Sequence, residues 1–179
     1  MTDPDLAAAE TAALLQARAH ALARPAQAEA GAGEQIEVLE FVLAQERYAI
    51  ETTWVHEVYP LKQLTPLPGT PAFILGIVNV RGRIVSVMDL RVFFGLPPRG
   101  ITDLNKVMIL GDGEMEFGIL GDVIVGTSWL ALADIQPPLP TMGGARRDYL
   151  KGVTAQQQVV LNAQALLAAS SVVVDQSPA

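Results

Sequence analysis

Cysteine is absent from this sequence of 179 residues, and charged residues make up only 17% of it. Without cysteine the chain can form no disulfide framework, no cysteine-based zinc site and no thiol nucleophile. The charged fraction lies below the roughly one quarter of average proteins, which predicts a surface apolar enough to seek partners. The formal net charge of −7 argues against nucleic-acid binding, which needs a basic face.

Membrane-spanning and secretory patterns are also missing. No apolar run reaches the roughly 18 residues that a membrane-spanning helix requires. The chain opens Met-Thr-Asp-Pro-Asp, with neither the basic segment nor the apolar core of a secretory signal. We therefore expect a soluble, cytoplasmic protein that does not insert into a membrane.

Catalytic patterns are scarce as well. The two histidines, His20 and His56, do not fall in a metal-binding spacing such as His-Glu-x-x-His. The sequence contains no nucleophile elbow, no phosphate-binding P-loop and no dinucleotide-binding glycine pattern. Glu114 and Glu116 share a strand face, but beside an Asp-Gly turn we interpret them as a solvated strand edge. The sequence therefore predicts a protein that is not an enzyme and that uses no cofactor or metal.

Three regions of the chain differ in composition. Residues 1–33 form an Ala-rich arm and linker, in which leucine spacing predicts a helix over Leu6–Arg24 that Pro25 ends. Residues 34–170 are β-rich and form the predicted folded domain, and residues 171–179 form a C-terminal tail. Because the apolar face of the arm is thin, we interpret it as a partly frayed helix, with a docking helix as the alternative.

The β-rich region consists of many short apolar runs separated by turns. Apolar periodicity predicts strands at 37–43, 47–50, 55–59, 74–80, 84–88, 106–110, 114–120, 123–127, 129–132, 149–153 and 159–161. Thr70-Pro71 predicts the start of a brief helix before the fourth run. Short strands at this spacing favour a barrel or a sandwich over a parallel α/β sheet.

One hairpin, Gly76–Phe94, organises this domain. Gly82 can adopt the positive φ of a tight turn between two strands rich in Val and Ile. Asp89 follows as the predicted N-cap of a short helix over Leu90–Phe94, which Gly95 ends.

A weaker echo of this hairpin occurs near the C-terminus. Gly152–Leu167 repeats the order of glycine, strand, turn, strand, cap and helix, with Asn162 as the cap and Ala163–Ala169 as the helix. The identity is too low for a sequence repeat, but the shared order predicts two similar β units.

The turn of the central hairpin carries two arginines, Arg81 and Arg83. An arginine at a hairpin tip can simply be solvated, but its planar head with several donors also favours protein interfaces. Trp54, Val55 and Val58 form an apolar strip upstream. If that strip lies beside the turn, the strip and the arginines together make a protein-binding patch.

The hairpin resembles the central motif of the CheW family of chemotaxis adaptors, Phe-Ile-x-Gly-x-x-Asn-Leu-Arg-Gly-x-x-x-Pro-x-x-Asp-Leu-Arg. Residues 73–91 match this pattern, except that Val80 stands in place of Leu and Ser86 in place of Pro. The likeness extends over about Gln35–Ala169. It implies an all-β fold with short helices, made of two intertwined SH3-like five-stranded β-barrel subdomains, to which the N-terminal Ala-rich helix and a short C-terminal helix are added.

The resemblance also implies a non-enzymatic scaffold that couples chemoreceptors (methyl-accepting chemotaxis proteins) to the histidine kinase CheA. The implied partners are the regulatory domain of CheA and the cytoplasmic tip of a receptor, within membrane receptor arrays. The family's receptor-facing groove corresponds to Val55, Glu57, Val58 and Arg81, with Asn79 supporting the arginine-bearing turn.

Three alternatives stay open at this point. The adaptor could serve a pilus-type system instead of flagellar chemotaxis. The chain could instead be a small-molecule-binding β-barrel domain, which would need a deep pocket with convergent polar groups. It could also be a regulatory fragment of a larger kinase.

Overall fold

The computed structural model describes residues 33–97, 100–102, 104–142 and 144–175. The predicted arm helix Leu6–Arg24 lies outside these residues. The chain divides into two compact units, residues 1–33 and 34–179, and every element named below belongs to the second unit.

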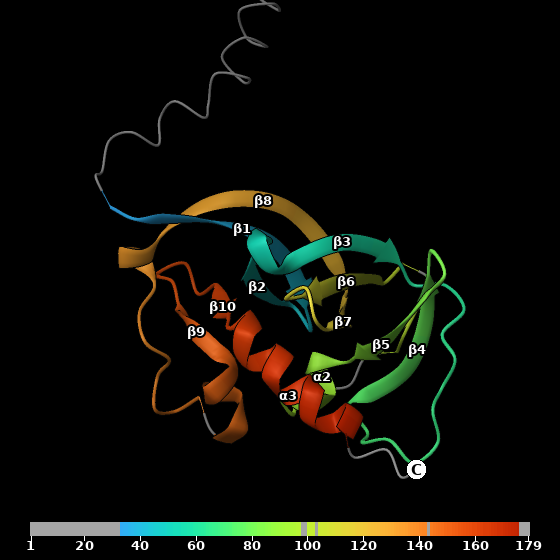
Figure 1. The fold of residues 1–179 in the computed structure, drawn as a ribbon. Helices are drawn as coiled ribbons and strands as arrows, with labels where there is room; N and C mark the ends of the chain where they lie inside the picture. Colours follow the sequence, from blue (N-terminus) through green and yellow to red (C-terminus); the bar gives the residue numbers. More distant parts are fainter. Residues whose placement is uncertain (1–32, 98–99, 103, 143, 176–179) are drawn as a thin grey trace, which may run out of the picture. The chain divides into compact units, whose positions relative to one another are not determined.

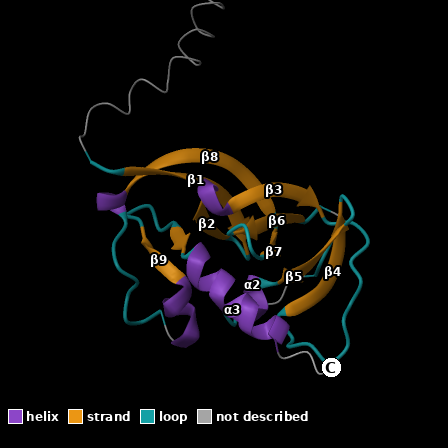
Figure 2. Cartoon of the chain, viewed as in Figure 1, coloured by secondary structure: helices purple, strands orange, loops and turns teal. Residues whose placement is uncertain are grey.

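Strands dominate this unit, with short helices between them (Figures 1 and 2). The strands are β1 (Gln35–Leu43), β2 (Glu46–Glu51), β3 (Val55–Pro60), β4 (Ile74–Val80), β5 (Arg83–Met88), β6 (Lys106–Gly111), β7 (Glu116–Gly121), β8 (Val123–Ala131), β9 (Leu150–Val153) and β10 (Val159–Leu161). The helices are α2 (Leu90–Phe93) and α3 (Ala163–Asp175), with 3-10 turns η2 (Thr52–Trp54), η3 (Leu132–Asp134) and η4 (Gly144–Tyr149).

The strands form two five-stranded sheets. Sheet A has the order β8-β1-β2-β10-β9, and sheet B has the order β3-β6-β7-β5-β4. The chain enters sheet A, crosses to sheet B for β3 to β7, and returns to sheet A for β8 to β10. The predicted fold class, all-β with short helices in two intertwined five-stranded units, is confirmed.

The two halves of the unit exchange strands in the same way. The first half supplies β1 and β2 to sheet A and β3, β4 and β5 to sheet B, whereas the second half supplies β6 and β7 to sheet B and the remaining three strands to sheet A. In each sheet an antiparallel hairpin receives a parallel strand from the other half, β5 on β7 and β10 on β2. The predicted echo between the two hairpins therefore reflects a real structural repeat.

Two glycines at equivalent places permit a close crossing of backbones. A Cβ on Gly76 would lie 2.2 Å from the carbonyl oxygen of Thr65, and one on Gly152 would lie 2.3 Å from that of Gln136. In both places the crossing chain forms an isolated β-bridge to the residue after the glycine. Only glycine, which has no Cβ, allows this approach.

The main core lies between the two sheets. It contains inward side chains of β1 and β2 from sheet A and of β6 and β7 from sheet B, and both helices contribute to it, α2 through Leu90 and α3 through Leu166. Each sheet also has a smaller cluster of its own, around Val38, Ala49 and Val160 in sheet A and around Val87 and Ile109 in sheet B.

Two predicted strand boundaries change in the second half. The predicted strands 123–127 and 129–132 form the single strand β8, because Gly126, at φ +146°, carries the backbone through a bulge opposite β1. Strand β7 begins at Glu116 and not at Glu114, because the Asp112 carboxylate accepts hydrogen bonds from the N–H groups of Glu114 and Met115 and lengthens the turn.

Two helix predictions also change. The brief helix predicted at Thr70-Pro71 is wrong: the N–H of Ile74 donates to the carbonyl of Pro71 at 2.9 Å, which closes a turn, and β4 begins at once. Helix α3 continues to Asp175, beyond the predicted end at Ala169, because residues 170–175 include neither glycine nor proline to end it.

Candidate partner-binding site

The turn between β4 and β5 is held by a side chain from β4. Arg81 and Gly82 both have positive φ, +52° and +85°, as in the tight turns that match the twist of a hairpin. Asn79 Oδ1 accepts a hydrogen bond from the backbone N–H of Gly82 at 2.8 Å. A positive φ is uncommon for arginine, so this bond helps to keep the Arg81 side chain at the tip.

Strand β3 brings a carboxylate to the same turn. Arg81 Nη2 lies 3.4 Å from Glu57 Oε2, and the two side chains are 78% and 20% exposed. Glu57 lies in β3 and Arg81 follows β4, and these two strands stand at opposite ends of the strand order of sheet B, so the curvature of the sheet brings the two side chains together. Glu57, Asn79 and Arg81 therefore form one cluster.

The predicted apolar strip is divided between the core and the surface. Trp54 and Val55 are partly buried and pack against the central core, whereas Val58 is 40% exposed. Alternation along β3 explains this division, because Val55 and Val58 are three positions apart and therefore point to opposite faces of the strand. Ile84 at the start of β5 is 64% exposed and adds apolar surface that the sequence analysis did not identify.

Arg83, Glu116 and His56 extend the cluster. Arg83 Nη2 lies 3.3 Å from Glu57 Oε1, and Arg83 Nη1 pairs with Glu116 Oε2. His56 Nδ1 lies 2.9 Å from Glu116 Oε1. The interpretation of Glu116 as a solvated strand edge is therefore wrong, because its side chain is only 25% exposed and has two partners. Glu114 is exposed, as that interpretation expected.

No local pattern predicts this extension, because its members are distant in the chain. His56 comes from β3 and Glu116 from β7, and β6 lies between these strands. A Cβ on Gly111, the last residue of β6, would lie 2.4 Å from His56 Cε1, so the imidazole ring covers this glycine. In the sequence, the only indication of this contact was the glycine itself, because a glycine in a strand often marks a place where another group approaches the backbone closely.

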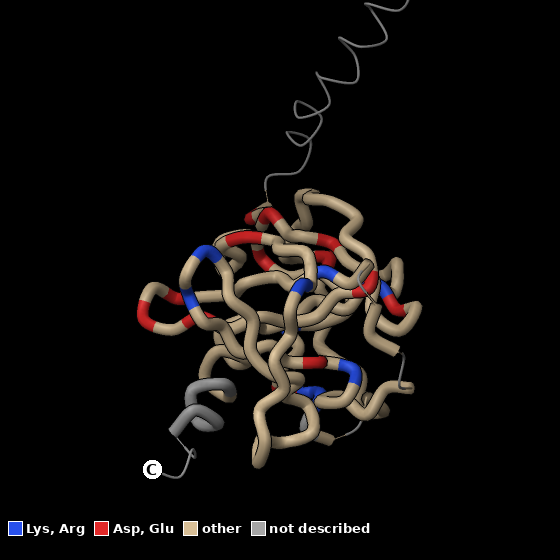
Figure 3. Tube along the Cα trace, turned by 90° about the vertical axis from the view of Figure 1, so that its right-hand side faces the viewer, with Lys and Arg blue, Asp and Glu red and all other residues tan. Residues whose placement is uncertain are grey.

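The cluster is electrically balanced on an acidic protein. Glu57 and Glu116 offset Arg81 and Arg83, so the cluster carries no net charge when His56 is neutral, whereas the whole chain carries −7. The hydrogen bond from His56, and then that from Arg83, lower the pKa of the Glu116 carboxyl below its ordinary value of 4.5. Glu116 is therefore fully charged near neutral pH. Figure 3 shows how sparsely charged residues are placed along the trace of this unit.

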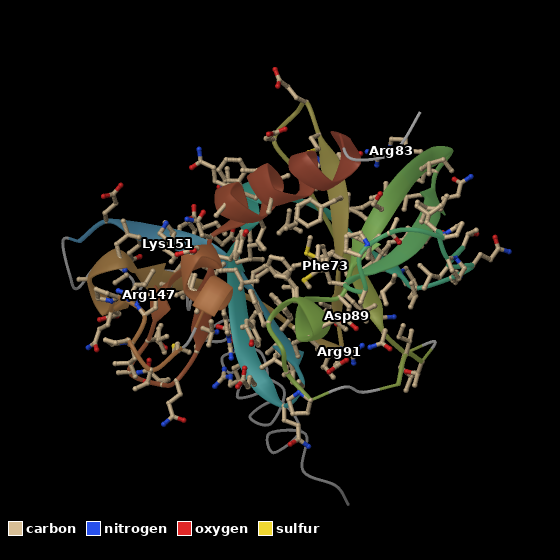
Figure 4. All side chains as sticks on the ribbon, turned by 90° about the horizontal axis from the view of Figure 1, so that it is seen from below. Phe73, Arg83, Asp89, Arg91, Arg147 and Lys151 are labelled. Carbon is tan, nitrogen blue, oxygen red and sulfur yellow. The ribbon has the colours of Figure 1, made fainter. Side chains whose placement is uncertain are left out.

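A second charged cluster is buried and holds the framework. Asp89 caps α2 by accepting the backbone N–H of Arg91 at 2.9 Å, and it also accepts Arg91 Nη2 at 2.8 Å. Arg91 Nη1 reaches Asp122 Oδ1 at 3.3 Å, and Asp122 Oδ2 accepts the N–H of Ala44 at 2.9 Å. Asp89 and Arg91 lie together beside α2 (Figure 4). The N-cap role predicted for Asp89 is confirmed, but the arginine that Asp89 shares with Asp122 was not predicted.

The charge on Arg91 is maintained although its side chain is only 1% exposed. Hydrogen bonds to Asp89 raise the pKa of the guanidinium above its usual value and outweigh the effect of burial. A paired and hydrogen-bonded charge is the form in which an arginine can be buried. We therefore assign this cluster to stability and not to binding.

A shallow hollow of about 500 Å³ lies elsewhere, at one end of sheet A. Its lining combines apolar and amide side chains such as Leu139, Met142 and Gln157 with the charged Glu46 and Arg47. Within the part of the chain that the structure describes, no three His, Cys, Asp or Glu residues are grouped to hold a metal ion. The same residues include no helix long and apolar enough to cross a membrane.

The fold is that of a β-sheet module with two interleaved five-stranded sheets and an exposed polar turn between β4 and β5. A model of the CheW-like domain matches residues 37–171. The chain therefore belongs to the CheW family, whose members are non-enzymatic scaffold adaptors of chemosensory signalling. This membership confirms the resemblance of the central hairpin and the prediction that the chain is not an enzyme.

Individual relatives agree with this assignment. "Protein FrzA" of Myxococcus xanthus is 34% identical over 107 residues, which cover 60% of this chain and 66% of FrzA. "Chemotaxis protein CheW" of Klebsiella aerogenes is 33% identical over 126 residues, covering 69% of this chain and 76% of that protein. The crystal structure of the scaffolding protein TtCheW from Thermoanaerobacter tengcongensis matches with a TM-score of 0.62 at 28% identity, covering 72% of this chain and 89% of that one.

Proposed function

We propose that this chain couples the cytoplasmic tip of a chemoreceptor to the regulatory domain of a CheA-type histidine kinase. In this proposal the receptor tip docks on Val55, Glu57, Val58, Asn79 and Arg81. The observation that carries it is the ion pair between Glu57 and Arg81, which the structure of the turn presents at an exposed hairpin tip.

The chemistry of Arg81 suits a protein partner. A guanidinium has five N–H donors in a planar fork, and Glu57 is the one ion partner that Arg81 has among the described residues. A carboxylate or carbonyl of the receptor can use the remaining donors. Two exposed apolar residues are near in sequence or register, since Val58 follows Glu57 in β3 and Ile84 pairs with Asn79 across the hairpin. Arginine is enriched among binding hot spots.

The cellular setting follows from this role. An adaptor that binds receptor tips and a kinase works in the cytoplasm, in membrane receptor arrays that it reaches through its partners. Similarity to "Protein PilI" of Pseudomonas aeruginosa, 27% identical over 104 residues, supports a second candidate, an adaptor of a pilus-type system. Binding assays with the CheA-type kinases of both kinds of system from the source organism would decide between the two.

We expect the substitution Arg81→Glu to weaken receptor binding without unfolding the protein. Replacing a hot-spot arginine costs about 1–3 kcal/mol of binding free energy, which is about 5- to 150-fold in Kd. Folding should be retained, because the side chain is 78% exposed and has a single long ion pair. The measurement is the affinity of the purified protein for a receptor cytoplasmic fragment and, separately, for the CheA regulatory domain.

Arg47→Glu is the matched control, because Arg47 is also an exposed arginine paired with a glutamate, but it lies in sheet A. It should leave receptor affinity unchanged, and both variants should still bind the kinase domain. If Arg81→Glu leaves the affinity for the receptor fragment unchanged, the receptor does not bind at this turn. A folded wild-type protein that bound neither partner would favour the small-ligand alternative.

A further inference from the structure

Glu57 is shared by two arginines that differ in how firmly they are held. Its Oε2 faces Arg81 Nη2 at 3.4 Å, and its Oε1 faces Arg83 Nη2 at 3.3 Å. Arg81 is 78% exposed, whereas Arg83 is 48% exposed. The pair with Arg81 is therefore the looser of the two.

Arg83 is anchored at a second point. Its Nη1 pairs with Glu116, and His56 binds the other oxygen of the same carboxylate. Arg83 thus bridges β3 and β7 with the two arms of one guanidinium. A guanidinium has the rigid fork that such a bridge needs, whereas a lysine ammonium is a single point charge on a flexible stem.

This arrangement decides what happens when Arg81 turns toward a partner. If Arg81 were the one cation near Glu57, its departure would leave Glu57 uncompensated and close to the incoming carboxylate of the partner. Two like charges a few ångströms apart repel each other, most strongly where the interface excludes water. Because Arg83 stays on Glu57, that repulsion is reduced while Arg81 exchanges partners.

We propose that Arg83 is a positioning residue of the partner-binding site, which holds Glu57 so that Arg81 can leave it and pair with a carboxylate of the partner. Glu116 and His56 support this role by fixing Arg83. The inference deepens the proposed function and rests on it, since it concerns the same receptor-facing turn.

The test is a double-mutant cycle on Arg81 and Arg83, with affinity for the receptor cytoplasmic fragment as the readout. Arg83→Leu should weaken binding about three- to tenfold, since a network of partly exposed charges is worth more than a single surface pair. In the Arg81→Ala background the same substitution should change Kd by less than about twofold, because Arg83 acts through Arg81. Arg83→Lys should fall between wild type and Arg83→Leu.

Two controls keep the test independent of folding. Arg47→Leu removes an arginine–glutamate pair in sheet A and should not change the affinity. We expect every variant to remain folded, because all of the replaced side chains are partly exposed. Thermal unfolding of each variant checks this. Binding of the kinase domain should be the same for every variant.

The possible outcomes separate this inference from the function on which it rests. If the wild type does not bind the receptor fragment, both fail. If Arg81→Ala weakens binding but Arg83→Leu does not, the positioning role alone is overturned. If the two losses multiply in the double variant, Arg83 acts independently of Arg81, which also overturns the positioning role.

Discussion

Replacing Arg91 with methionine should destabilise the folded protein by about 3–5 kcal/mol, the usual cost of removing one partner of a buried ion pair. The reason is that Asp89, whose side chain is 5% exposed, would keep its charge and lose its cation. Asp122 would lose one of its partners as well. The free energy of unfolding in urea measures the effect.

Two further variants test the explanation. Arg47→Met removes an exposed ion pair and should cost no more than about 1 kcal/mol. Adding Asp89→Asn to Arg91→Met should restore part of the loss, because asparagine can still cap α2 without a buried charge. If Arg91→Met alone lowered the free energy of unfolding by less than about 1 kcal/mol, the charge of Asp89 would be compensated by groups other than Arg91.

Gly76→Ala should be much more destabilising than Gly126→Ala, although both glycines have φ +146°. Alanine in this backbone conformation is strained by about 1–3 kcal/mol at either position. At Gly126 a new Cβ meets open space, but at Gly76 it would lie 2.2 Å from the carbonyl oxygen of Thr65. We expect at least about 2 kcal/mol of additional loss at Gly76, in the upper range for single substitutions.

Gly152→Ala separates the close contact from the strain. Its Cβ would lie 2.3 Å from the Gln136 carbonyl oxygen, but its φ lies outside the left-handed region. Urea unfolding of the three variants should therefore place Gly152→Ala near or above Gly126→Ala and below Gly76→Ala. Equal losses for Gly76→Ala and Gly126→Ala would mean that the crossing segment moves aside without cost.

Local chemistry was sufficient to predict the central hairpin. Gly82 marks its turn, and Asp89 caps the helix that follows it, because both features depend on residues close together in the chain. The recurring order of elements also predicted two similar units. The exchange of strands between those units depends on pairing between distant segments, which periodicity within a single strand does not encode.

The candidate site was predictable only in part, for the same reason. The motif of the hairpin identified Asn79 and Arg81, and the resemblance supplied Glu57. The contacts of Arg83 with Glu57 and Glu116 depend on the curvature of sheet B and on the order of its strands. Glu116 looked like one of the charged residues that protect strand edges, and only the neighbouring strands show that it is paired.

The chain crosses between the sheets through very short connections. Between β2 and β3 there is only the single turn η2, and between β7 and β8 there is only Asp122. Asp122 is itself held by Arg91, Asn105 and the backbone of Ala44. Neither connection has the length or the freedom of a hinge. We therefore expect the two sheets to move as one body, so that the distance and angle between the surfaces that they present stay fixed.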